Sequence, residues 1–265
     1  GGQVIIDNRG GGNTVIGNDI VAKATPDGYT LLVAGAGQIA ISLVYRKIPY
    51  DVVKDFMPIA GIARSEFVLV VHPALPVNTV ADLIALGKKK PGELNYATSS
   101  TGGPTHLAPV QFGMLTGVIM QQVPYKGGGP AMTDIVAGQV QLGFANPASA
   151  TPFLKAGRLR AIAVTGDKRL DSMPQVPTFA EAGVPGLAMR NWYAITAPAG
   201  VPKPIIDKLS TTILKIAAMP EVKTATVRQG LETFSATSEQ VDALRREDLA
   251  ILTKVVQAAN IKIQD

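Results

Sequence analysis

Strands and helices alternate regularly between residues 94 and 164, and this alternation limits the fold more than any other feature of the chain. Each of the three expected helices has a proline near its first position and a glycine just past its end, the usual asymmetry of helix termini. Short strands alternating with helices are typical of a doubly wound, mostly parallel sheet. The expected strands are 94–97, 118–123, 140–144 and 160–164, and the expected helices are 104–115, 130–137 and 147–156.

Loops with polar residues follow the first three of these strands, at 98–103, 125–129 and 145–146, and the first two also contain glycines. Ligands of parallel sheets bind at the carboxyl ends of the strands, and unpaired N–H groups at a helix N-terminus favour anions. A single loop of this kind is as well explained by an ordinary strand-to-helix turn. Three such loops in succession predict that three helix N-termini converge on one pocket for a small anion such as a carboxylate.

The remaining elements are expected from apolar periodicity and from helix-capping residues. Thr79, Thr178 and Thr237 each begin a capping-box pattern, so a helix is expected after each of them. The other expected helices are 14–24 and 203–219, and the other expected strands are 4–6, 29–34, 59–63, 67–71 and 191–197.

Composition excludes several classes of protein. The chain has 265 residues, of which 46% are apolar, enough for one large domain or two lobes. The formal net charge is +5, but the basic residues are scattered, and the only basic run, 88–90, lies at an expected helix end. Nucleic-acid binding is therefore not expected. The absence of cysteine excludes disulfides and thiolate metal sites, and two histidines are too few for a histidine-rich metal site.

Catalytic motifs are absent from the sequence. It contains no G-x-S-x-G, no S-x-x-K and no Walker lysine. A pocket of hydroxyls and backbone amides without a nucleophile–base pair suits binding better than turnover, so neither a cofactor nor a catalytic residue is expected. Gly35, Gly37 and Ala40 match a dinucleotide fingerprint, with Asp51 or Asp55 as the acidic residue, and this leaves a Rossmann-type enzyme as one alternative.

Each of two further residues has two possible roles. His106 follows the hydroxyl loop and could donate to a ligand or hydrogen-bond its own loop. Trp192, the only tryptophan, could line a cleft or fill the core.

An ordered series of short motifs extends over nearly the whole chain. It consists of DNR at 7–9, PDGYTL at 26–31, YD at 50–51, KDF at 54–56, LNYA at 94–97, VPYKG at 123–127, AG at 156–157, LRA at 159–161, VPT at 176–178, EAG at 181–183, APAG at 197–200 and PKP at 202–204. Together these motifs resemble the TctC/Bug family, the extracytoplasmic solute receptors of tripartite tricarboxylate transporters.

The resemblance implies an α/β periplasmic binding protein fold of type II with two lobes, each a doubly wound, mostly parallel sheet. It implies a periplasmic monomer that captures a small carboxylate between the lobes and delivers it to membrane permease subunits. We expect lobe I to comprise 1–70 plus 192–265 and lobe II to comprise 71–191, with hinge closure over the ligand. Family members carry a signal peptide, a strand, a ligand-binding loop and a helix before the first residues given, and we expect these to be absent here.

The family's ligand contacts transfer to particular positions of this sequence. The implied ligand-binding residues are Ala36, Gly37, Thr98, Ser99, Ser100, Gly102, Thr105, His106, Ala145 and Asn146. Two positions depart from the family pattern, since Ala145 stands where many relatives have Asp and Gly103 where many have Thr or Ser. Both changes remove polar groups, so a roomier pocket is expected, suited to a dicarboxylate or an aromatic carboxylate rather than an amino acid.

The effector-binding domain of a transcriptional regulator is the other alternative, because it shares this architecture. Such a protein should carry a helix-turn-helix segment, and none is visible in the sequence.

Overall fold

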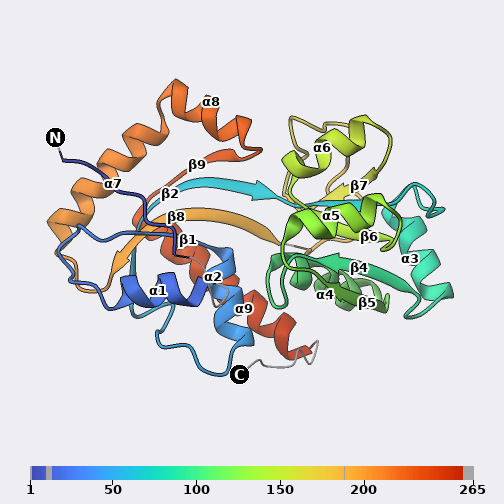
Figure 1. Ribbon diagram of the computed structural model, residues 1–265, viewed down its shortest axis with the longest axis horizontal. Helices are drawn as coiled ribbons and strands as arrows, with labels where there is room; N and C mark the ends of the chain where they lie inside the picture. The colour runs from blue at the N-terminus through green and yellow to red at the C-terminus, as the bar shows by residue number, and fades with distance from the viewer. Residues whose placement is uncertain (1, 10–13, 188, 259–265) are drawn as a thin grey trace.

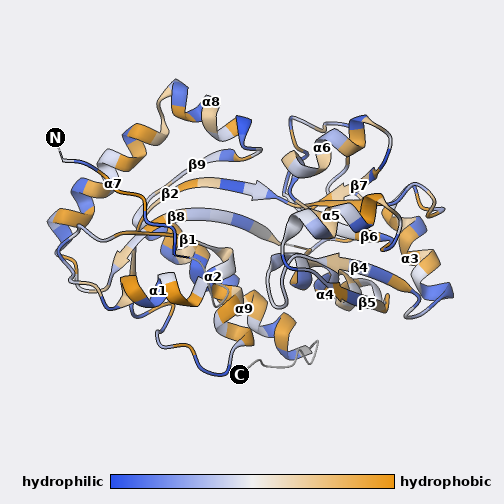
Figure 2. Ribbon diagram, in the orientation of Figure 1, coloured by the Kyte–Doolittle hydropathy of each residue, from blue (hydrophilic) through white to orange (hydrophobic). Residues whose placement is uncertain are grey.

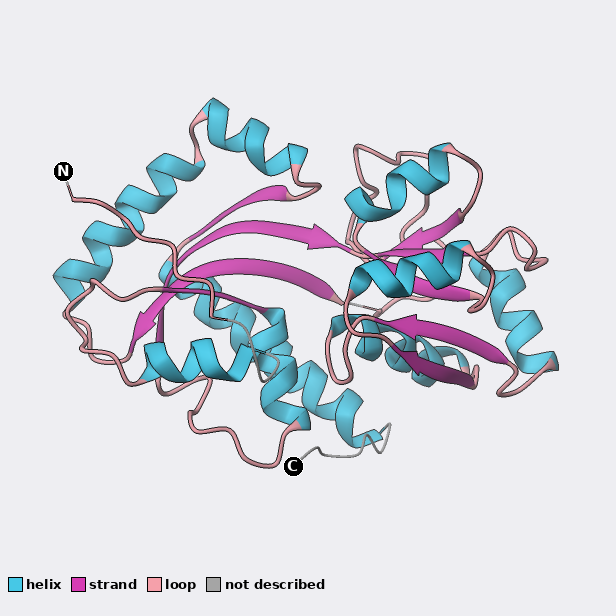
Figure 3. Ribbon diagram, in the orientation of Figure 1, coloured by secondary structure: helices cyan, strands magenta, loops and turns pink. Residues whose placement is uncertain are grey.

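The computed structural model describes residues 2–9, 14–187 and 189–258. The strands form two sheets that lie side by side, and helices cover the faces of both (Figure 1, Figure 3). The α/β architecture predicted from the sequence, with helices on both faces of a sheet, is thus present in each half of the molecule.

The first sheet has the strand order β1-β8-β2-β9, and every neighbouring pair is antiparallel. The prediction of a mostly parallel sheet in both lobes is therefore wrong for this one. The physical reason is the path of the chain: β2 runs towards the second sheet and β8 returns from it, so the two strands point in opposite directions. The strands are β1 (Leu32–Gly35), β2 (Phe56–Glu66), β8 (Arg190–Pro198) and β9 (Glu232–Ala236).

Helices pack on both faces of the first sheet. In Figure 1, α7 and α8 lie above the sheet, and α1, α2 and α9 lie below it. On α7 the expected apolar stripe packs through Ile206 against Ile59 and Ala197. The bounds are α1 (Val15–Ala22), α2 (Ala36–Val44), α7 (Lys203–Ala217), α8 (Pro220–Arg228) and α9 (Ser238–Ala258).

The second sheet has the order β5-β4-β6-β3-β7. Here β4 is parallel to both β5 and β6, as the alternation predicted, whereas β3 is antiparallel to β6 and β7 because it enters from the first sheet. The strands are β3 (Val68–Val71), β4 (Leu94–Thr98), β5 (Met120–Pro124), β6 (Leu142–Ala145) and β7 (Arg160–Val164).

β3 shows how this sheet is buried on both faces. All four of its side chains are fully buried. Leu69 and Val71 belong to the core under α3 and α4, and Val68 and Val70 to the core under α5 and α6, as the two-residue period of a strand requires. The helices are α3 (Val80–Lys89), α4 (Pro104–Thr116), α5 (Gly128–Val136) and α6 (Pro147–Lys155).

The predicted helix ends are well reproduced. The N–H of Asp82 donates to Thr79 Oγ1 at 3.1 Å and the N–H of Thr79 to Asp82 Oδ2 at 2.9 Å, which completes the capping box of α3. Gly117 follows α4 with φ of 74°. Figure 2 shows both polar and apolar residues on α3 and α7, as expected for helices with one exposed side. Among the described helices, none combines the length and apolar character that crossing a membrane requires.

Two expectations for local structure are wrong. Residues 4–6 form no strand, and Val4, Ile5 and Ile6 are exposed. The capping bonds of Thr178 form, but residues 178–183 form turns and no helix. The sequence analysis also missed α2, α8 and β9. The helix α8 has no buried residue, so it lacks the apolar period by which helices are recognised.

Candidate functional site

Three strand-to-helix turns of the second sheet meet at a cavity of about 220 Å³ that faces the first sheet. Ser99 and Thr105 come from the turn between β4 and α4, Gly128 begins α5, and Asn146 precedes α6. The convergence of three helix N-termini, predicted from the alternation, is present in the structure.

Hydrogen bonds hold the hydroxyl loop in place at the cavity wall. The hydroxyls of Ser99 and Thr105 lie 2.9 Å apart, and the N–H of Ser99 donates to Thr105 Oγ1 at 3.1 Å. The N–H of Gly127 donates to the carbonyl of Ser99 at 3.0 Å, which ties the turn before α5 to the turn before α4. The loop is therefore ordered by its own residues before any ligand binds.

The wall formed by the helix N-termini is rich in hydrogen-bond donors. Neither Gly103, the N-cap of α4, nor Gly127, the N-cap of α5, has a side-chain cap. Proline removes one N–H from each first turn and the N–H of His106 donates to Gly103, which leaves the N–H groups of Thr105, Gly128 and Gly129 for a ligand. Asn146 Oδ1 accepts from the N–H of Ala148 at 2.9 Å, and its Nδ2 has no partner among the described residues. No charged side chain is found among the described residues that line the cavity. An anion here is stabilised by backbone and amide dipoles rather than by a cation.

The opposite wall comes from the first sheet. Asn191 and Tyr193 of β8 line the cavity, and Asn191 Nδ2 donates to the Tyr193 hydroxyl at 2.8 Å and to Ser65 Oγ at 3.2 Å. The residue between them, Trp192, points to the other face, is 2% exposed, and donates from Nε1 to Asp248 Oδ2 at 2.6 Å. Trp192 therefore fills the core.

Sequence reasoning missed Asn191 and Tyr193. The signal that could have found them is the alternation along the strand, because the residues on either side of a buried tryptophan face the other way. The cavity also has apolar lining residues, which include Phe67, Phe144 and Ala145.

Ser99, Thr105, Ala145 and Asn146 are the predicted site residues that line this cavity. The others lie elsewhere. Thr98 is fully buried, and its Oγ1 accepts from Gln122 Nε2 at 3.0 Å. The first turn of α2 contains Ala36 and Gly37.

The loop between β4 and α4 is shaped by its two glycines. Ser100 folds over Gly103, where an added Cβ would lie 2.3 Å from the Ser100 hydroxyl. Gly102 has φ of +81°, and an added Cβ would lie 2.3 Å from Cγ2 of Val44 in α2. Gly103 departs from the family pattern, and in this loop a side chain at position 103 would collide with Ser100.

His106 supports the loop from behind. The N–H of Gly102 donates to His106 Nδ1 at 3.0 Å, and the imidazole stacks on Tyr96 with a centroid separation of 6.4 Å. The side chain is 6% exposed, and burial lowers the pKa of His106 below its usual value. Of the two readings left open by the sequence, the structure shows the hydrogen bond to its own loop.

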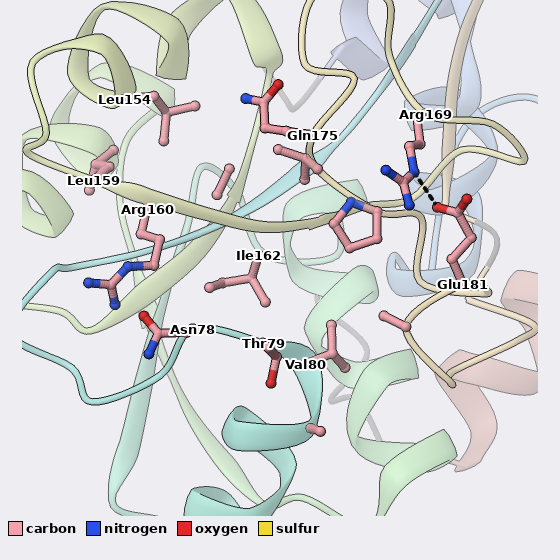
Figure 4. A pocket seen from close by; sticks show the side chains of 15 residues that line it. Asn78, Thr79, Val80, Leu154, Leu159, Arg160, Ile162, Arg169, Gln175 and Glu181 are labelled. Carbon is pink, nitrogen blue, oxygen red and sulfur yellow. Dashed lines mark hydrogen bonds and ion pairs between the residues drawn. The ribbon is translucent and has the colours of Figure 1, made fainter.

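A second hollow, of about 530 Å³, lies at the outer edge of β7 (Figure 4). Its two arginines are engaged by the protein: Arg169 Nε donates to Glu181 Oε2 at 2.8 Å, and Arg160 Nη1 donates to the carbonyl of Val77 at 2.7 Å. None of the predicted site residues lines it. The cavity between the sheets is therefore the better candidate site.

The dinucleotide fingerprint has the wrong structural context. Gly35 ends β1 and Gly37 lies in α2, but β1 pairs antiparallel with β8, whereas the nucleotide fold needs a parallel βαβ unit. The described residues also contain no group of three or more His, Asp or Glu side chains that could hold a metal ion.

Two α/β halves that enclose a cavity lined by helix N-termini, without a nucleophile–base pair among the described lining residues, are the features of a solute-binding protein. The family described as "Tripartite tricarboxylate transporter family receptor", TctC, matches residues 1–261. The chain belongs to this family.

Solved structures agree with this assignment. The R. palustris protein Rpa4515, solved with adipate, is 36% identical with a TM-score of 0.85, over 97% of this chain and 86% of that one. The periplasmic binding protein BugD is 29% identical with a TM-score of 0.82, over 98% and 88% of the two chains. MatC from Rhodopseudomonas palustris, with bound malate, is 27% identical with a TM-score of 0.79, over 93% and 85%.

The family consists of solute receptors of the periplasmic binding protein type and not of enzymes. The two alternatives that the sequence left open, a regulator's effector domain and a Rossmann-type enzyme, are excluded by this membership.

Proposed function

We propose that this chain captures a small dicarboxylate in the cavity between its sheets and presents it to the membrane subunits of a tripartite tricarboxylate transporter in the periplasm. The observation that carries the proposal is the lining of the cavity: hydrogen-bonding groups come from both halves of the molecule, and apolar side chains line the cavity with them. A dicarboxylate combines the matching groups, two polar ends and a hydrocarbon middle.

One carboxylate is assigned to the wall of helix N-termini. Its partners are the N–H of Gly128, the hydroxyls of Ser99 and Thr105, and Nδ2 of Asn146. Hydrogen bonds from several fixed donors compensate the desolvation of an anion where no cation is present.

The second carboxylate is assigned to Asn191 and Tyr193 of β8, and the hydrocarbon chain to the apolar lining residues Phe67, Phe144 and Ala145. The adipate and malate held by the similar proteins support this class of ligand. Ala36 and Gly37 remain predicted contacts from the first turn of α2.

We propose that the molecule works as two lobes joined at two crossings. β2 ends at Glu66 and β3 begins at Val68, while the return crossing enters β8 at Arg190. Sheet membership therefore supports lobe borders at Phe67 and Met189, within a few residues of the limits expected from the sequence. Ligand that bridges both lobes stabilises the closed arrangement, and one chain supplies both walls, so a monomer suffices.

Isothermal titration calorimetry against adipate, malate, benzoate and glutamate tests the ligand class. Dicarboxylates should bind, and glutamate should not, because no carboxylate among the described lining residues can pair with its ammonium group. Binding of amino acids alone would contradict the proposal. Binding of benzoate without the dicarboxylates would replace the dicarboxylate by an aromatic carboxylate, the other ligand class expected from the sequence.

A further inference from the structure

Gly230 lies in the turn between α8 and β9, in the half of the molecule built on the first sheet. It is placed against Ala148, the second residue of α6, which belongs to the other half. The contact is therefore one of the points at which the two lobes touch.

The contact depends on the absence of a side chain at position 230. A Cβ built on Gly230 would lie 2.1 Å from Cβ of Ala148 and 3.1 Å from its Cα and its backbone nitrogen. Real Cβ atoms do not approach one another so closely, so the turn and the helix would have to separate. The φ of +70° also favours glycine, which means that local strain and the contact between lobes must be distinguished.

The contact is adjacent to the candidate site without being part of it. The N–H of Ala148 donates to Oδ1 of Asn146, which lines the cavity. Ala148 and Gly230 themselves line a separate hollow of about 370 Å³ on the other side of the first turn of α6. The contact between the lobes thus lies in the first turn of α6, two residues from a residue that lines the ligand cavity.

A similar contact lies elsewhere between the lobes, with the roles of the lobes exchanged. There Gly102, from the second-sheet half, meets Val44 of α2, from the first-sheet half. In this structure the lobes therefore meet at two glycines, one from each lobe.

We infer that Gly230 is a positioning residue for ligand binding: its missing side chain lets the α8–β9 turn reach α6, so that the lobes close far enough to complete the cavity. The inference rests on the proposed function. A side chain at this position holds the lobes apart and lowers the population of the binding-competent form, which weakens the apparent affinity in proportion.

The first test compares Gly230→Ala with Gly157→Ala by calorimetry with adipate. Gly157 has φ of +67° and no neighbour within 4 Å of an added Cβ, so this control introduces a similar backbone strain without a contact between lobes. We expect Gly230→Ala to weaken adipate binding by about tenfold or more and Gly157→Ala by less than about twofold. Equal affinities of the two variants would overturn the inference.

A second substitution that restores adipate binding distinguishes the contact between lobes from local backbone strain at position 230. Removing the Cβ of Ala148 relieves the 2.1 Å approach, so Gly230→Ala combined with Ala148→Gly should recover most of the lost affinity, although the strain at position 230 persists. A double variant that binds no better than Gly230→Ala alone would also overturn the inference.

A substitution at Ala148, in the other lobe, tests the same contact without changing position 230, where a variant could misfold. Ala148→Leu enlarges an exposed helical position, so it should spare the fold of its own lobe and still weaken adipate binding, whereas Ala225→Leu on α8 should not. Affinity unchanged by Ala148→Leu would count against the inference. Should the unaltered protein bind none of the carboxylates, the proposed function fails. Should it bind adipate while all these variants bind equally well, only the role of Gly230 fails.

Discussion

His106 links acidity to the order of the loop that carries Ser99. Its Nδ1 accepts the N–H of Gly102 at 3.0 Å, which requires that this nitrogen carry no proton. Burial of the ring lowers the pKa of His106. Protonation of Nδ1 would break the hydrogen bond from Gly102 and place a charge in the core. The loop before α4 is therefore the part of the site that acid weakens first.

The free energy of unfolding should fall as the pH is lowered. The unfolded chain takes up a proton near the ordinary histidine pKa of 6.5, whereas the folded chain takes it up only at the lower, folded pKa. The contribution of His106 is thus complete above pH 6.5 and is lost as the pH falls towards the folded pKa. Urea denaturation at about pH 8 and about pH 5 measures the difference.

His106→Asn provides an uncharged acceptor and should reduce this pH dependence, whereas His72→Asn, at the only other histidine, should leave it in place. Identical pH profiles for the unaltered protein and His106→Asn would show that the titration lies elsewhere.

Tyr193→Phe removes one hydroxyl from the β8 wall of the cavity. Since that hydroxyl accepts from Asn191 and faces the proposed second carboxylate, affinity for adipate should drop about tenfold, the equivalent of roughly one hydrogen bond. The melting temperature should change little. Calorimetry makes the measurement, with Tyr29→Phe at a 93% exposed tyrosine as the control. Unchanged affinity would exclude Tyr193 from the site.

At the scale of elements, α9 is joined to β8 by the hydrogen bond from Trp192 to Asp248. Both side chains are buried, at 2% and 6% exposure, and α9 also packs on α2 and α4. Trp192→Phe should lower the free energy of unfolding by about 2–4 kcal/mol, because it removes a donor to a buried carboxylate and leaves space in the core.

Circular dichroism during urea denaturation measures this loss, since the variant has no tryptophan fluorescence. Asp248→Asn retains an acceptor and should cost less than Trp192→Phe. A variant with Phe at 192 that is as stable as the parent would show that the bond contributes nothing net.

Local sequence signals predicted most helices and strands, but they predicted strand pairing only in the second sheet. The capping box at Thr79 and the glycine after α4 are decided by residues within one turn, so they could be read directly from the sequence. The antiparallel first sheet could not, because it depends on β8 returning from the second sheet, more than a hundred residues after β2. Residues 4–6 have strand-like side chains but no partner strand among the described residues.

The site was predictable on one wall only. Ser99, Thr105 and Asn146 stand in turns that follow strands, where the rule for parallel sheets expects a ligand. Asn191 and Tyr193 lie in a strand of the other sheet, and only the packing of the two halves brings them to the same cavity. His106 is expected in the site from the family resemblance, and in the structure it is not among the lining residues of the cavity but accepts a hydrogen bond from Gly102 of the loop.

For the whole molecule, we expect adipate to make the protein more compact in solution. Ligand held by both sheets favours the arrangement in which Gly230 meets Ala148 and Gly102 meets Val44. Small-angle X-ray scattering with and without saturating adipate should show a smaller radius of gyration for the complex. Unchanged dimensions at saturation would contradict closure, and Gly230→Ala should show a smaller decrease than the unaltered protein.

The lack of a charged side chain among the described residues of the cavity wall affects more than the ligand. Under the proposed function, a dicarboxylate would enter without a counter-ion from the protein, so the complex would carry two negative charges that the empty form lacks, against a formal net charge of +5. The electric field around the loaded protein would then differ from that around the empty one. At physiological salt this difference would extend about 8 Å, which would allow a membrane subunit docked over the site to distinguish the loaded receptor from the empty one.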